Sequence, residues 1–220
     1  MARGRDFDVV CFDCDSTLSR VEGIDELARR AGVEREVAPL TEAAMAGALP
    51  LDAVYRKRLA LVRPDAAAIA WLAALYVDEM VEGAVEAVET LHGAGKDVHI
   101  VSGGLRQAIL PLAERLGIPA NNVHAVDVIL GHDGAYADFD QASPLARPEG
   151  KAGVCRVLSD GGRAVALVGD GATDIVAREA GAFVIGFGGV ATRPAVVAGA
   201  DIFVHGPELT AVLGPLLVAR

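Results

Sequence analysis

Residues 8–18 read DVVCFDCDSTL, a short apolar run that ends in two acidic residues, Asp13 and Asp15. Because residues two apart in an extended chain point the same way, the run predicts a β-strand with two carboxylates at its exit. Such a pair could bind a divalent cation, or one carboxylate could attack a phosphorus centre while the other moves a proton. Acidic residues at strand ends are also common as turn formers and helix N-caps, so this stretch alone leaves both interpretations open.

Four more strand-like runs follow along the chain, and helix-like segments separate most of them. Alternation of strands and helices is typical of a parallel, doubly wound α/β sheet, which is the fold class that we predict. The predicted strands are 9–12, 98–101, 164–168, 183–185 and 202–204.

Two regions depart from this alternation. The interval from about Ser19 to Tyr76 reads as helical throughout and is too long for an ordinary crossover. We interpret residues 19–76 as a helical cap over the carboxyl edge of the sheet, which leaves residues 1–18 and 77–220 for the α/β core. The segment VHAVDVILGHDGAYADFD contains two alternating runs around Asp133 and Gly134, and it predicts a small β-hairpin flap beside the main sheet.

The composition narrows the class of protein. The 220 residues suffice for one sizeable core plus a small accessory domain, and a hydrophobic content of 52% argues against disorder. A net charge of −10 repels nucleic acid and anionic membranes, so we expect neither as a partner, and an anionic substrate would need locally concentrated positive charge. The partner that we expect is a small-molecule substrate, and we allow for a homodimer. No apolar run approaches the roughly 18 residues of a membrane helix.

The cysteines and the N-terminus bear on the compartment. Three cysteines give no disulfide framework, and the N-terminal MARGRDFD lacks the apolar stretch of a signal peptide, so we expect a cytoplasmic location. Cys11 and Cys14 form a CxxC motif, but no second pair completes a zinc site. Only about seven residues precede the first predicted strand, so we expect no amino-acid-binding regulatory module before the catalytic unit.

A serine and two glycines follow the second predicted strand. Ser102, Gly103 and Gly104 come between strand 98–101 and a helix-like segment at 105–116. A hydroxyl and glycines at a helix N-terminus can hold a phosphate through the hydroxyl and free backbone N–H groups. An ordinary N-cap with flexible turn residues is the commoner reason for such a sequence, and both interpretations stay open.

The GDGATD segment after the next predicted strand carries Asp170, Thr173 and Asp174. Its glycines allow close approach of a ligand, and its carboxylates could complete an oxygen-rich cation site with Asp13. An acidic turn is the alternative, but three strand ends would then carry polar groups at the sheet edge where α/β proteins bind ligands. Considered alone, Lys151 reads as a surface charge. Together with Asp13, Ser102 and Asp170 it is the obvious cation for a transferring phosphoryl group.

Taken in order, DCDST, the SGG after the second strand, the lone Lys151 and GDGATD resemble the four motifs of the haloacid dehalogenase superfamily of aspartyl-phosphate phosphatases. The segments VEGIDELA, AMAGALP, RKRLALV, VSGGLR and IGFGG are similar to those of the phosphoserine phosphatase family within it. The resemblance runs from about Asp8 to Leu213. It implies a Rossmann-like core, a helical cap, Mg²⁺ as cofactor, and hydrolysis of O-phospho-L-serine as the final step of serine biosynthesis.

The resemblance also implies a role for each residue of the site. Asp13 would be the nucleophile, Asp15 the proton donor and acceptor, and Ser102 and Lys151 the groups that stabilise the phosphoryl oxygens. The implied ligands of Mg²⁺ are Asp13, the backbone carbonyl of Asp15, Asp170 and, directly or through a second layer of contacts, Asp174. The implied substrate contacts are Glu22 for the ammonium group, Arg58 for the carboxylate, Met45 with Ala46 as an apolar wall, and Ser102, Gly103, Gly104, Lys151, Thr173 and Arg193.

Some positions would read differently without the resemblance. Glu22 would be a solvated charge at a helix start, and Arg58 a surface partner for a residue four positions away. Where the family often has glycine after the cap methionine, this chain has Ala46, which adds a methyl group close to the expected substrate.

Two other functions remain open. The same fold could act on another small phosphomonoester such as phosphohomoserine, or transfer the phosphoryl group to a different hydroxyl, because fold does not fix function. A more distant alternative is a non-enzymatic phospho-acceptor domain, which also gathers acids, a hydroxyl and a lysine at a sheet edge. The long cap and Asp15 argue against the second alternative.

Overall fold

The computed structural model describes residues 6–45 and 51–217, and of residues 42–45 and 51–52 it describes the backbone only. The strands are β1 (Val9–Phe12), β2 (Asp97–Leu105), β3 (Val123–Val126), β4 (Val128–Leu130), β5 (Tyr136–Phe139), β6 (Val165–Gly169), β7 (Phe183–Phe187) and β8 (Ile202–Val204). The helices are α1 (Gly23–Ala31), α2 (Glu34–Met45), α3 (Leu51–Val62), α4 (Ala66–Asp78), α5 (Ala84–Gly93), α6 (Arg106–Arg115), α7 (Gly150–Leu158), α8 (Ala172–Ile175), α9 (Pro194–Gly199) and α10 (Leu213–Leu216). Short 3-10 turns occupy Ala120–Asn122, Pro144–Ala146, Asp160–Gly162, Val176–Ala180 and Leu209–Val212.

A parallel sheet forms the centre of the molecule, with strand order β3-β2-β1-β6-β7-β8. The two central strands, β1 and β6, are buried along their whole length. Their continuous apolar sequences suit strands that are covered on both faces. The strand order reverses between β1 and β6, and in open α/β sheets ligands bind beside the carboxyl ends of the strands at such a reversal. The structure confirms the predicted doubly wound parallel sheet.

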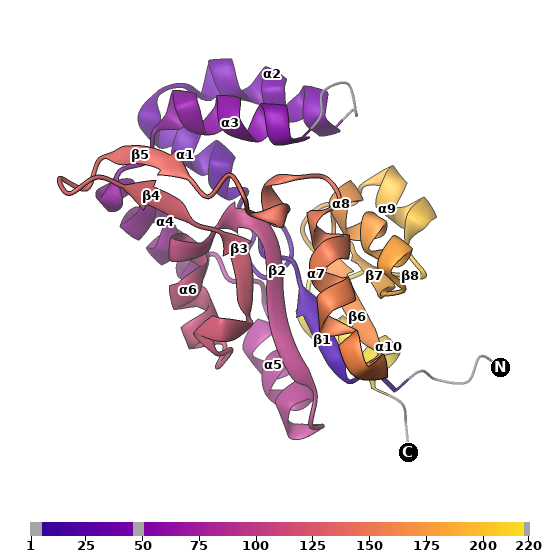
Figure 1. Ribbon diagram of the computed structural model, residues 1–220. Coiled ribbons are helices and arrows are strands. Elements are labelled where there is room, and N and C mark those ends of the chain that lie inside the picture. Colours follow the sequence, from indigo (N-terminus) through magenta and orange to yellow (C-terminus); the bar gives the residue numbers. More distant parts are fainter. Residues whose placement is uncertain (1–5, 46–50, 218–220) are drawn as a thin grey trace.

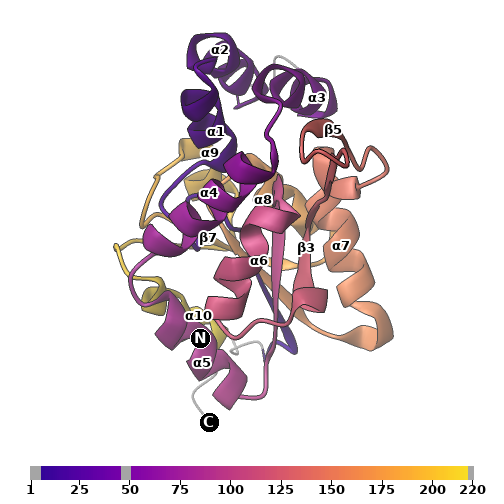
Figure 2. The ribbon, with the colours of Figure 1, turned by 90° about the vertical axis from the view of Figure 1, so that its left-hand side faces the viewer.

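Helices cover both faces of this sheet. Helices α5, α6 and α10 lie on one face, and α7 lies on the other (Figure 2). Helix α7 packs against the 3-10 turn Val176–Ala180, which follows α8. Together these layers enclose a core that extends across the sheet.

Helices α1, α2 and α3 lie above the carboxyl edge of the sheet (Figure 1). Helix α4 lies beside α6 and packs closely against it. The β4–β5 hairpin contacts α3, since the rings of Tyr55 and Phe139 lie 5.1 Å apart. The helical segment thus contacts both the sheet edge and the flap, and the exact limits of the cap, residues 19–76, stay a prediction.

The hairpin is shorter than the sequence predicts. Its expected first run divides at Asp127: β3 joins the main sheet beside β2, and β4 alone pairs with β5. The side chain of Gln107 donates to the carbonyl of Val128 at 2.9 Å and accepts from its N–H at 3.0 Å. The Gln107 side chain thus satisfies the backbone N–H and carbonyl of Val128, which lies just past the end of β3, where pairing with the main sheet stops. The alternation of apolar residues does not reveal this division, because it continues on both sides of Asp127.

Among the described residues, no single helix has the length and apolar composition of a membrane span, although α3 from Ala53 onward and α4 pass that test as a pair bent by 110°.

Candidate active site

Asp13 and Asp15 lie where β1 ends, at the centre of the sheet edge. The N–H of Asp13 donates to the carbonyl of Val168 at 2.9 Å, which extends the pairing of β1 with β6 by one residue. The next residues form a tight loop, because Leu18 and Ser19 both donate their N–H to the carbonyl of Cys14. The predicted pair of carboxylates therefore leaves the sheet together but enters two different environments.

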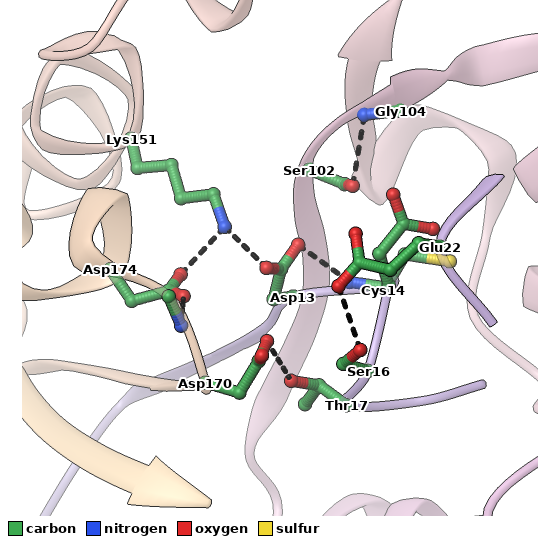
Figure 3. A network of polar contacts seen from close by, with 12 residues as sticks. Asp13, Cys14, Ser16, Thr17, Glu22, Ser102, Gly104, Lys151, Asp170 and Asp174 are labelled. Carbon is green, nitrogen blue, oxygen red and sulfur yellow. Dashed lines mark hydrogen bonds and ion pairs between the residues drawn. The ribbon is translucent and has the colours of Figure 1, made fainter. Parts of the chain in front are cut away.

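The carboxylate of Asp13 lies between a backbone donor and a buried lysine (Figure 3). Oδ1 accepts the N–H of Cys14 at 2.7 Å, and Oδ2 lies 2.6 Å from Nζ of Lys151. The same ammonium group lies 2.6 Å from Asp174. Burial lowers the pKa of Lys151, but the two carboxylates outweigh it and raise that pKa above its ordinary value. Lys151 is therefore a fixed positive charge beside Asp13.

Three carboxylates converge at this edge and could hold a metal ion. Oxygen atoms of Asp13, Asp170 and Asp174 all lie within 4.8 Å of one another, and all three residues are buried. Burial and the charge of Asp13 raise the pKa of Asp170 to about 6. Burial likewise raises the pKa of Asp174 to about 7, although Lys151 opposes the shift. A cation bound here would favour the ionised carboxylates, and oxygen donors of this kind suit a hard divalent ion.

Gly169, the last residue of β6, makes this cluster possible. A β-carbon at Gly169 would lie 2.2 Å from the carboxyl carbon of Asp174. Oδ1 of Asp174 accepts from Lys151, and its Oδ2 accepts the N–H of Gly171 at 2.9 Å. The glycines of GDGATD thus allow the Asp174 carboxylate to lie against the backbone. The close approach of a ligand that the sequence predicts for these glycines stays a prediction.

Ser102, Gly103 and Gly104 belong to β2 and not to a helix start. The strand continues to Leu105, which is itself the N-cap of α6, and its register with β3 shifts between Val101 and Leu105. Oγ of Ser102 accepts the N–H of Gly104 at 3.1 Å (Figure 3). The expectation of a helix N-terminus at this serine is therefore wrong, and the hydroxyl reaches the cavity from a strand end.

The Asp15 carboxylate lies outside the three-carboxylate cluster. Its Oδ1 accepts from the hydroxyl of Tyr76 at 2.6 Å and from the N–H of Gly23 at 3.2 Å. Burial and the charge of Glu22 raise the pKa of Asp15 well above its ordinary value, while the Tyr76 hydroxyl acts in the opposite direction. A carboxyl group of this kind can hold a proton and give it up. The prediction that the Asp15 carbonyl binds metal stays a prediction.

Glu22 lies on the cap side and is paired. Its Oε1 accepts from the hydroxyl of Ser16 at 2.8 Å and from Arg193 at 2.9 Å. The same guanidinium donates to Asp170 at 2.9 Å. Thr17 donates to the other oxygen of Asp170 at 3.4 Å. Arg193 thus connects the predicted ammonium site with the carboxylate cluster.

A cavity of about 830 Å³ joins these groups to the cap. Arg58 lines it from α3 and donates to Thr41 at 3.4 Å. Thr173 lies on the wall near Asp170. The cap side is largely apolar, with Ile24, Leu27, Tyr55, Leu59 and Leu72. Ala46 and the side chain of Met45 lie outside the described residues.

The sequence did not point to Tyr76, Thr17 or Ser16 as parts of this site. Tyr76 belongs to an Ala- and Leu-rich helix, in which a tyrosine reads as a core residue. The DST stretch after Asp13 was the available signal for Ser16 and Thr17, but it equally suits a helix cap.

Comparison with known proteins agrees with this geometry. The haloacid dehalogenase-like hydrolase profile matches residues 7–181, a span that includes β1 and α7 and extends past β6. The chain belongs to the haloacid dehalogenase-like hydrolases. Its four motif segments lie at one sheet edge around a single cavity.

Similar proteins of this haloacid dehalogenase-like family include phosphoserine phosphatases. Phosphoserine phosphatase of Homo sapiens is 40% identical over 191 residues, which cover 86% of this chain and 85% of that protein. The chloroplastic phosphoserine phosphatase of Arabidopsis thaliana is 38% identical over 201 residues, 90% of this chain and 68% of that protein. A structure of a phosphoserine phosphatase described as a phospho-aspartyl intermediate analogue has a TM-score of 0.81 and 30% identity, and the match covers 97% of this chain and 100% of that one.

Proposed function

We propose that this protein is a phosphatase that hydrolyses O-phospho-L-serine to serine and phosphate through an aspartyl phosphate on Asp13. The observation that carries the proposal is the position of the Asp13 carboxylate, in the cavity and 2.6 Å from a buried lysine, in a chain 40% identical to a phosphoserine phosphatase. A carboxylate can attack phosphorus only if the negative phosphoryl group is brought to it, and the fixed charge of Lys151 does this.

The residues divide the reaction between them. Asp13 attacks phosphorus in line, while Lys151 and the Ser102 hydroxyl stabilise the phosphoryl oxygens. Asp15 gives its proton to the departing serine oxygen. Water, deprotonated by Asp15, then attacks the aspartyl phosphate and releases phosphate. The cap covers this edge of the sheet, and closure of the cap would exclude water during the first step.

We propose Mg²⁺ as the metal, held by Asp13, the Asp15 carbonyl and Asp170, with Asp174 beside them. When bound, the ion neutralises charge on the phosphoryl oxygens. An all-oxygen donor set supports a hard cation. Excess EDTA should abolish activity and Mg²⁺ should restore it, whereas Ca²⁺ should bind but support little turnover, because its coordination shell is larger and looser. Full activity in EDTA after exhaustive dialysis would exclude a metal requirement.

We propose that the substrate's amino-acid part is read from the cap. Glu22 would bind the ammonium group and Arg58 the carboxylate, since a zwitterion needs one anion and one cation at short range. Both side chains line the same cavity as Asp13. The predicted roles of Met45 and Ala46 as an apolar wall, and of Gly103, Gly104, Thr173 and Arg193 as further contacts, are part of this proposal.

A cytoplasmic location is also proposed. The three cysteines are free and buried, which suits a reducing compartment. Assembly as a homodimer stays a prediction.

The test is phosphate release from a panel of phosphorylated amino acids and sugars, with and without Mg²⁺. A marked preference for L-phosphoserine supports the proposal. Preference for phosphohomoserine would support the alternative phosphomonoesterase instead. An Asp13 phosphate that forms but does not hydrolyse would indicate a phospho-acceptor domain.

A further inference from the structure

Among the described residues, donors reach the Asp15 carboxylate on one of its two oxygens. Tyr76 and Gly23 both donate to Oδ1, at 2.6 and 3.2 Å. Among the described residues, no hydrogen-bond partner holds Oδ2, and Asp15 lines the cavity. Two donors on one oxygen fix the plane of the carboxylate and leave the second oxygen for the substrate.

The structure makes room for the Tyr76 hydroxyl at Gly23. A β-carbon at Gly23 would lie 2.1 Å from the hydroxyl oxygen, so any larger residue there would push the hydroxyl away from Asp15. Tyr76 itself is 0% exposed. A fully buried hydroxyl needs a hydrogen-bond partner, and Asp15 supplies it.

Tyr76 is carried by an element that is tied to the loop of Asp15. Helix α4 packs against α6 of the core. Just beyond the helix, Val81 donates its N–H to the carbonyl of Leu18 at 2.9 Å, and Arg20 donates its N–H to Glu79 at 2.8 Å. These bonds tie the end of α4, and with it the Tyr76 hydroxyl, to the loop that carries Asp15.

We propose that Tyr76 is a positioning residue, which orients the Asp15 carboxyl group so that its second oxygen meets the leaving oxygen of the substrate. The inference rests on the proposed function. As the bond from Asp13 to phosphorus forms, the bond from phosphorus to the serine oxygen breaks, and the Asp15 proton passes to that oxygen. Water then loses a proton to Asp15 and bonds to phosphorus, and the bond to Asp13 breaks.

The test compares two leaving groups in Tyr76→Phe, which removes only the hydroxyl. Rapid-quench single turnovers measure phosphoenzyme formation from phosphoserine and from p-nitrophenyl phosphate. With phosphoserine, the rate should fall about tenfold, a part of the 10²- to 10⁴-fold that proton transfer contributes. With p-nitrophenyl phosphate it should change less than about twofold, because nitrophenolate departs without a proton. The KM for phosphoserine should stay within about twofold, since Tyr76 reaches substrate only through Asp15.

Two variants serve as controls. Tyr136→Phe removes the hydroxyl of another buried tyrosine, on β5 and outside the cavity, and should leave both rates unchanged. Asp15→Asn should show the same dependence on the leaving group as Tyr76→Phe, but more strongly.

Equal slowing with both substrates, or no slowing with phosphoserine, would overturn the role of Tyr76. If thermal unfolding shows that Tyr76→Phe does not fold, the same two substrates are compared in Gly23→Ala, whose methyl group would displace the Tyr76 hydroxyl. If Asp15→Asn itself shows no dependence on the leaving group, the proposed role of Asp15 is wrong. Failure of Tyr76→Phe alone, beside the expected Asp15→Asn result, refutes only the inference.

Discussion

The two sides of the cavity are built differently. On the sheet side, Lys151 lies 2.6 Å from both Asp13 and Asp174, and all three side chains are buried. On the cap side, Arg58 reaches Thr41 at 3.4 Å, and its buried Nε has no hydrogen-bond partner among the described residues.

This difference teaches where the protein is preorganised. The charges that would act on the phosphoryl group are fixed by their ion pairs without substrate, so little reorganisation would be needed during the reaction. Of the two charges that would recognise the amino acid, Glu22 is already paired with Arg193, whereas the Nε of Arg58 has unused hydrogen-bonding capacity. A substrate carboxylate would supply the missing acceptor. We therefore expect changes on the sheet side to affect chemistry and stability, and changes on the cap side to affect the choice of substrate.

The largest effect is expected at Asp13. Asp13→Asn should abolish turnover and leave no phosphoenzyme, because an amide does not attack phosphorus. Acid quench of the variant with labelled substrate measures this directly. If Asp13→Asn still forms the same acyl phosphate, the nucleophile is another residue.

Lys151→Met tests the sheet side through stability. It keeps most of the side-chain volume but leaves two buried carboxylates without their cation, which should lower the free energy of unfolding by about 3 to 5 kcal/mol. Urea denaturation without metal measures the change. Lys57→Met, at an exposed position of α3, is the matched control and should stay within about 0.5 kcal/mol of the parent. Similar midpoints for the two variants would show that the buried pairs contribute little.

Arg58→Ala tests the cap side through specificity. Loss of one partner of a buried charge pair should cost about 2 to 4 kcal/mol in kcat/KM for phosphoserine. The loss should be far smaller for p-nitrophenyl phosphate, which has no carboxylate. Arg56→Ala, on the same helix but exposed, should change neither value. Equal losses on both substrates would mean that Arg58 acts through cap folding and not through recognition.

The smallest effect is expected at Thr41. Its hydroxyl accepts from Arg58 at 3.4 Å and donates to Asp25 at 3.3 Å, and both distances are long for hydrogen bonds. Thr41→Val should therefore cost no more than about 1 kcal/mol in kcat/KM for phosphoserine, with kcat unchanged. Steady-state kinetics decide this, and a loss as large as that of Arg58→Ala would show that the cap side is as firmly ordered as the sheet side.

Local sequence patterns were enough to predict the strands and the acidic residues that follow them. Strands β1 and β8 have the bounds expected from their apolar runs. Asp13 and Asp170 follow two neighbouring parallel strands and therefore lie at one edge, where Asp174 of α8 and Lys151 of α7 join them.

Contacts between distant parts of the chain could not be predicted from the sequence. The pairing of Glu22 with Arg193 joins residues 171 positions apart, and the bond from Tyr76 to Asp15 spans 61. Neither contact has a signature in sequence spacing, because each depends on how α1 and α4 pack over the sheet. The continuation of β2 through Ser102 to Gly104 was missed for a similar reason, since glycines favour a turn unless a neighbouring strand holds them extended.

The position of Cys14 has a consequence for the lifetime of the covalent intermediate. An aspartyl phosphate is an activated acyl group, and a thiolate one residue away could take the acyl carbon and leave a dead-end thioester. Burial and the adjacent charges of Asp15 and Asp13 raise the pKa of Cys14 well above its ordinary value, so the sulfur stays a thiol, which is a poor nucleophile. The carboxylates that we propose for the hydrolysis would thus also protect the aspartyl phosphate from a competing acyl transfer.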